Sequence, residues 1–145
     1  LTGLLKDHPM NYRAYLQRSN LYHEMENDKT ALADAKQACF LAPLDAMAMN
    51  HLAWLMVTSD DPEVFDAERG LEVAERAVKA REAPQIVDTL AVAYAQTGDF
   101  DKAVELEEKA LAMMEEDDKD RDRYVRLLEH FRQRRPYANF EEEED

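Results

Sequence analysis

Small residues recur at helical spacing along this chain. Three pairs are each seven positions apart: Ala31 and Ala38, Gly70 and Ala77, and Ala103 and Ala110. Seven residues make about two turns of an α-helix, so both members of a pair lie on one helix face. Small side chains there let a second helix approach closely. The pattern predicts three closely packed helices.

A second apolar stripe precedes each of these helices. Tyr15, Ser19 and Tyr22 have the i, i+4, i+7 spacing of one helix face. Ala53 and Met56 repeat the last two of these positions 34 residues later, and Pro9 and Pro43 are also 34 residues apart. The chain therefore consists of repeated helix pairs. The helices are expected near residues 11–25, 28–41, 45–58 and 66–80, in a third pair that starts near Pro84 and continues through Ala103 and Ala110, and at 117–134.

The connections agree with this division. Asn27 and Asp28 provide a turn and an N-cap. Residues 59–65 form a loop about five residues longer than a simple hairpin turn, a length that repeat proteins tolerate. Gly98 can adopt the left-handed conformation that ends a helix. So few turn residues, three glycines and five prolines, argue against a many-stranded β fold.

These residues carry a resemblance to a known family. The chain resembles tetratricopeptide-repeat (TPR) proteins, whose period is 34 residues. The match rests on Tyr15, Tyr22, Ala31, Ala38 and Pro43 in the first unit and on Leu90, Ala91, Tyr94, Gly98, Phe100, Ala103 and Ala110 in the third. Residues 50–55, Asp60-Asp61-Pro62 and Arg135-Pro136-Tyr137 are similar to bacterial TPR proteins with a lengthened middle repeat. Three positions depart from the pattern: Arg18, Glu107 and Glu115.

The resemblance implies an all-α solenoid of antiparallel helical hairpins with a C-terminal capping helix. Its expected parts are the end of a truncated preceding repeat at 1–9, TPR units at 10–43, 44–81 and 82–115, the capping helix at 116–135 and an acidic, disordered tail at 136–145. A helix stripe of Tyr124, Leu127, Leu128 and Phe131 suits a cap.

The net charge of the chain limits the kinds of molecule it is expected to bind. The formal net charge is −14, with 32 acidic and 18 basic residues. This balance argues against nucleic acid and anionic membranes, which require clustered cations. It indicates either a solvated surface or a basic partner. No apolar run reaches the roughly 20 residues of a membrane span, so no membrane insertion is expected. A single cysteine fits a reducing compartment, and we expect a cytoplasmic protein.

Little in the sequence suggests catalysis, and no enzyme activity, cofactor or metal is expected. Cys39 lies in an apolar helix without a neighbouring histidine, which indicates a structural thiol. The four histidines lack metal-ligand spacing. Asp118, Asp120, Asp122 and Glu129 imitate the spacing of a calcium-binding loop, but Arg123 stands where that loop requires glycine.

The resemblance instead implies a binding groove on the first helices of the hairpins. The expected peptide-binding residues are Arg13, Leu16, Asn20, His23, Met47, Asn50, Trp54, Gln85, Asp88 and Val92. The asparagines could bond a peptide backbone. Trp54 could anchor an apolar side chain, or it could pack between hairpins. The basic clamp of co-chaperone TPRs is not matched, since Leu16, His51, Gln85 and Thr89 occupy its positions.

The sequence therefore predicts a protein–protein interaction scaffold. Two alternatives remain open at this point: an accessory TPR domain of a larger enzyme such as a kinase or transferase, and a self-assembly module that pairs through an open N-terminal end.

Overall fold

The computed structural model describes residues 11–138 and 140, and in this part of the chain it contains seven α-helices and no strand. The helices are α2 Tyr12–Glu24, α3 Asp28–Leu41, α4 Ala46–Thr58, α5 Ala67–Ala80, α6 Pro84–Gln96, α7 Phe100–Ala112 and α8 Arg121–Arg132. The predicted all-α fold class is confirmed. The predicted truncated repeat at 1–9 and most of the acidic tail lie outside the described residues.

Local sequence explains where most helices begin. The side chains of Asn11, Asn27, Asp45, Asp66 and Asp99 each accept a hydrogen bond from a backbone N–H of the first turn that follows. These N–H groups have no partner within their own helix, so a side-chain oxygen there stabilises the helix start by about 1 kcal/mol. Helix α6 begins differently, with Pro84 in its first turn.

Gly98 ends α6 as predicted, with a φ of 91°. The predicted capping helix is shorter than expected. It begins at Arg121 rather than 117, because residues 115–120 form turns in which Asp118 accepts a hydrogen bond from the N–H of Asp120. Asp and Ser/Thr side chains compete in this way with regular helix geometry.

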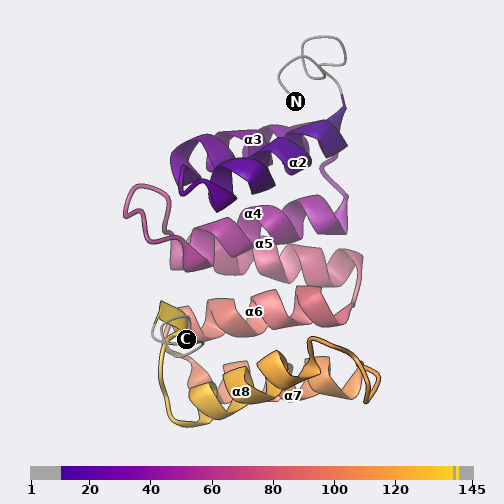
Figure 1. The fold of residues 1–145 in the computed structure, drawn as a ribbon, viewed down its shortest axis with the longest axis vertical. Coiled ribbons are helices and arrows are strands. Elements are labelled where there is room, and N and C mark those ends of the chain that lie inside the picture. The colour runs from indigo at the N-terminus through magenta and orange to yellow at the C-terminus, as the bar shows by residue number, and fades with distance from the viewer. Residues whose placement is uncertain (1–10, 139, 141–145) are drawn as a thin grey trace.

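Each helix packs against the next along the chain, and α4 also contacts α6. Figure 1 shows these elements stacked in chain order along the long axis, from α2 and α3 at one end to α7 and α8 at the other. The small residues lie at the closest approaches: Ala31, Ala38, Ala74, Ala77, Ala103 and Ala110 are fully buried. A Cβ at Gly70 would overlap the Cγ1 of Val57, so α4 and α5 pack closely only with glycine there.

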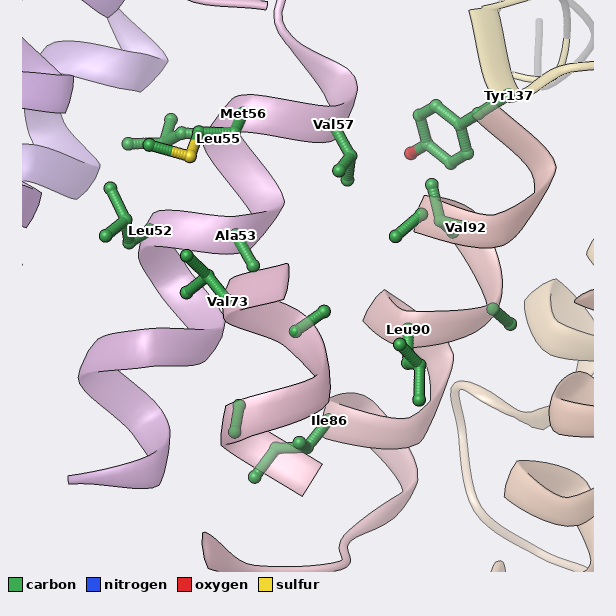
Figure 2. Packing of buried hydrophobic residues seen from close by; sticks show 14 of the residues in the cluster. Leu52, Ala53, Leu55, Met56, Val57, Val73, Ile86, Leu90, Val92 and Tyr137 are labelled. Carbon is green, nitrogen blue, oxygen red and sulfur yellow. The ribbon is translucent and has the colours of Figure 1, made fainter. Parts of the chain in front are cut away.

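One continuous apolar core runs through α3 to α8 and includes the C-terminal segment. Figure 2 shows part of it, with Leu52 and Met56 of α4 near Val73 of α5 and with Tyr137 next to Val92 of α6. Tyr137 and Phe140 are both buried. The chain therefore folds back after α8 and packs its last described aromatic residues against the middle of the stack.

Candidate functional site

Helices α2 and α4 bring seven of the ten predicted binding residues to one surface, which we call the α2–α4 face. It comprises Arg13, Leu16, Asn20 and His23 from α2 and Met47, Asn50 and Trp54 from α4. All seven are exposed or partly exposed. Their spacing of three and four residues keeps them on one side of each helix.

A hydrogen-bonded chain holds α2 and α4 together behind this face. The Ser19 hydroxyl donates to the carbonyl of Ala31 at 2.6 Å, and it lies 2.8 Å from Nε2 of His51. A hydroxyl has one hydrogen, so Ser19 accepts from a His51 ring that carries its proton on Nε2. Burial, with a smaller contribution from His23, lowers the pKa of His51 to about 4. The ring is therefore neutral at physiological pH and donates to Ser19 through Nε2.

Asn50 presents an unsatisfied acceptor on the α2–α4 face. Its Oδ1 atom is enclosed, and it has no hydrogen-bond partner among the described residues. Leaving such a group unpaired costs about 1–3 kcal/mol. Asn20, on the facing helix, makes only a long 3.4 Å bond to Glu24. The exposed amide of Asn20 can bond an incoming group directly, whereas Asn50 has to turn its enclosed amide oxygen outward to do so.

Trp54 packs against a neighbouring ring and also lines a depression, so it combines the two roles that the sequence suggested, packing and anchoring a partner. Its ring meets Tyr137 edge to face, with centroids 5.4 Å apart. Its other side borders a depression of about 450 Å³. The wall of this depression is completed by His23, Thr58, Asp60, Arg123, Tyr137 and Ala138. An apolar side chain could enter here and contact the indole.

A second, strongly acidic depression adjoins the first and shares His23, Thr58 and Asp60 with it. Its volume is about 570 Å³, and its other lining residues are Glu24, Glu26, Asp28 and Asp61. The long loop at 59–65 supplies Asp60 and Asp61. Ser59 Oγ donates to Asp28 at 2.6 Å, and His23 Nδ1 bonds the other Asp28 oxygen at 2.7 Å. The lengthened loop is thus fixed against the start of α3.

The three predicted residues from α6 do not extend this surface. Gln85 is exposed, but Asp88 and Val92 are buried. Tyr137 lies beside Val92 (Figure 2), and Asp88 interacts with Glu107 of α7 and Arg123 of α8. The prediction treated α6 as open like α2 and α4. In the structure α8 and the C-terminal segment cover it, so Asp88 and Val92 are core residues.

Asp88 and Glu107 form a buried carboxyl pair. Their exposed fractions are 4% and 0%. No N–H or other hydroxyl among the described residues bonds the Glu107 oxygens, so the two groups share one proton in a hydrogen bond between them. Burial, and then the charge of Asp88, raise the pKa of Glu107 well above its ordinary value. Glu107 is therefore the protonated partner.

Arg18, another of the three departures from the repeat pattern, is also accounted for. Its guanidinium makes a bidentate ion pair with Asp34 of α3, with both distances 2.7 Å. It also lies 5.8 Å and 5.9 Å from the ring centroids of Tyr15 and Tyr22. Arg18 thus joins α2 to α3 through charge, where the repeat pattern would place a large apolar side chain.

The described part of the chain gives little support for a metal site or a reactive cysteine. There, no group of three His, Cys, Asp or Glu residues is arranged to hold a metal ion. Asp122 and Arg123 belong to helix α8 rather than to a calcium loop. Cys39 is half-buried, and burial raises the pKa of its thiol to about 11. Residues 11–138 and 140 also include no helix long and apolar enough to cross a membrane.

Comparison with known proteins does not assign the chain to a family. No protein-family model matches it, and no curated protein matches it. The residues that sequence reasoning missed are Tyr137 and Phe140, which reach the centre of the fold. The Arg135-Pro136-Tyr137 ending was noticed as part of the resemblance, but its spacing gave no sign of the contact with Trp54.

Proposed function

We propose that this chain is a TPR-type interaction module that binds a segment of another polypeptide on the α2–α4 face. The observation that carries the proposal is the enclosed, unpartnered Oδ1 of Asn50. Rotation of the Asn50 amide exposes this oxygen, and a backbone N–H of a bound segment is then the simplest donor for it. Trp54 lies one turn further along α4, so the same segment can bond Asn50 and place a side chain against the indole.

The two depressions indicate the chemistry of that segment. The one beside Trp54 suits an apolar side chain, while the acidic one suits a lysine or arginine. Charged walls of one sign attract the opposite charge and speed association. The preferred segment therefore carries a basic residue next to an apolar residue. The chain's overall charge of −14 acts in the same direction.

Selection from a random peptide library displayed on phage tests this proposal. We expect the selected peptides to pair basic with apolar residues, and the double variant Asn20→Ala/Asn50→Ala to weaken their binding by about tenfold or more, the loss of one to two good hydrogen bonds. The melting temperature should stay nearly unchanged, because both amides make little internal bonding.

Gln133→Ala provides the matched control, since Gln133 is an exposed amide that follows α8. It should leave peptide binding as in the parent chain. Binding that survives the double asparagine change would reject the α2–α4 face as the site. A selection dominated by acidic peptides would reject the proposed chemistry.

A further inference from the structure

A separate groove runs between α3 and α5, on the other side of α4. It has a volume of about 350 Å³. Met49, Leu52 and Met56 of α4 form part of its lining, and at about 100° per residue they lie opposite Met47, Asn50 and Trp54 on that helix. The groove is therefore independent of the α2–α4 face.

The walls of this groove are apolar and basic. They contain Lys36, Cys39, Phe40, Pro43, Arg69, Val73 and Arg76. No carboxylate lines it, although acidic residues outnumber basic ones by 32 to 18 in the whole chain. Because its thiol pKa is raised to about 11, Cys39 is neutral and adds no negative charge.

The three cations of the groove have no internal counter-ion. Within the described residues, Lys36, Arg69 and Arg76 form no ion pair. The next pair of helices provides a comparison within the same molecule. Lys102 and Lys109 of α7 stand before Ala103 and Ala110, just as Arg69 and Arg76 of α5 stand before Gly70 and Ala77.

On α7 the two corresponding cations each have a carboxylate partner. Lys109 bonds Glu82 at 2.7 Å, and Lys102 lies 4.0 Å from Glu105. The clear difference is at the second cation: Glu82 neutralises Lys109, whereas the position 33 residues before Glu82 is Met49, which lines the α3–α5 groove beside Arg76. Phe40 adds to this contrast, because its side chain is 77% exposed at the rim of the α3–α5 groove. Contiguous apolar surface marks interaction sites, and Phe40 extends the apolar lining of the groove out to the molecular surface.

We propose that the α3–α5 groove is a second docking surface, and that its occupant is an amphipathic segment of another polypeptide carrying carboxylates beside apolar side chains. The apolar side chains of this segment lie over Met49, Leu52 and Phe40. Its carboxylates pair with Arg69 and Arg76, whose planar guanidinium groups favour bidentate contacts. This partner has the opposite charge from the one proposed for the α2–α4 face, so the module joins two different proteins.

The test uses two synthetic amphipathic helical peptides of equal length, one built from leucine and glutamate and the other from leucine and lysine. Fluorescence anisotropy measures their binding to the full chain. We expect the leucine–glutamate peptide to bind, and Arg69→Glu/Arg76→Glu to weaken it by at least about tenfold, because two attractive contacts become repulsive. Amide NMR shifts should centre on Cys39, Phe40 and Arg76.

Lys102→Glu/Lys109→Glu is the matched control, since it makes the same change in net charge at the corresponding positions of α7. It should alter binding by less than about threefold, as expected for exposed charges outside the contact. Three results would overturn the proposal: no binding at millimolar peptide, equal binding of the leucine–lysine peptide, or equal losses in the two double variants. Melting temperatures of both variants establish that the fold is retained.

Discussion

At the scale of single residues, the buried carboxyl pair shows where a sequence pattern can mislead. Asp88 falls at a spacing that suited a groove, and Glu107 occupies a position where the repeat pattern expects an aromatic. The structure explains both at once, because the two side chains meet inside the fold and share a proton. Neither residue alone contains this information, since they lie on different helices and their pairing depends on how α6 and α7 pack.

The pair makes stability fall as pH rises. The pKa of Glu107 is raised in the fold, so above the ordinary value of 4.5 the folded chain binds more protons than the unfolded chain. The free energy of unfolding then decreases, by up to about 1.4 kcal/mol per pH unit for one group. In the Glu107→Gln variant the side-chain amide can donate an N–H to Asp88 at any pH, without first taking up a proton. Thermal unfolding at pH 5 and pH 8 should show a higher melting temperature at pH 8 and a flatter decline between them.

Glu108→Gln is the control for this prediction, because Glu108 is an exposed neighbour on the same helix. It should leave the decline with pH as it is. A Glu107→Gln protein that is less stable at both pH values would contradict the shared proton.

His51 has the opposite effect on stability. Its pKa is lowered to about 4 in the fold. Between that value and the ordinary value of 6.5 the unfolded chain binds more protons, so stability is lost as pH falls below 6.5. His51→Gln keeps an N–H donor for Ser19 and cannot titrate. Its unfolding free energy, measured by urea denaturation from pH 7 to pH 4.5, should fall less steeply than that of the parent chain.

A direct check of the same prediction is an NMR titration of the His51 ring. We expect it to remain neutral through pH 5.5. A ring that becomes protonated near pH 6.5 without loss of structure would contradict the lowered pKa and the burial that causes it.

At the scale of helices and segments, the pattern predicted the elements well because they depend on local signals. Small residues two turns apart and capping side chains placed α2 to α5 within a residue or two, and Pro84 and Gly98 marked the two ends of α6. The start of α8 was wrong by four residues, since a run of aspartates is compatible with both turns and a first helical turn. The path of the chain after Arg132 could not be predicted, because Tyr137 and Phe140 reach their partners through contacts distant in sequence.

The C-terminal segment is expected to stabilise the middle of the stack. Tyr137 packs on Trp54, its hydroxyl accepts a hydrogen bond from Arg123 at 2.7 Å, and its N–H donates to Gln96 at 3.1 Å. Tyr137→Ala should therefore lower the free energy of unfolding by about 3 kcal/mol or more, the usual cost of removing a buried aromatic. Trp54 is the only tryptophan, so its fluorescence emission should shift to the red.

Tyr137→Phe isolates the hydroxyl and should cost about 1–2 kcal/mol with little change in emission. Ala138→Ser, at an exposed neighbouring position, serves as the control. Unchanged stability and emission in Tyr137→Ala would mean that the segment does not pack on α4 in solution.

At the scale of the whole molecule, charge distribution rather than shape separates the two proposed surfaces. The α2–α4 face ends in an acidic depression, whereas the α3–α5 groove is rimmed by unpaired cations. The net charge of −14 can be read from the sequence, but this division of charge cannot, because it depends on which helix faces are adjacent. The predicted face survives on α2 and α4 and is closed at α6, where α8 and the C-terminal segment cover it.

An NMR titration of the chain with a basic–apolar peptide from the phage selection decides whether a polypeptide binds on the α2–α4 face. We expect saturable shifts of the Trp54 indole and of the Asn20 and Asn50 side-chain amides, while signals of Phe40 and Arg69 stay in place. Saturable binding that leaves Trp54 and Asn50 unshifted would contradict this expectation, because the polypeptide would then occupy a surface other than the α2–α4 face.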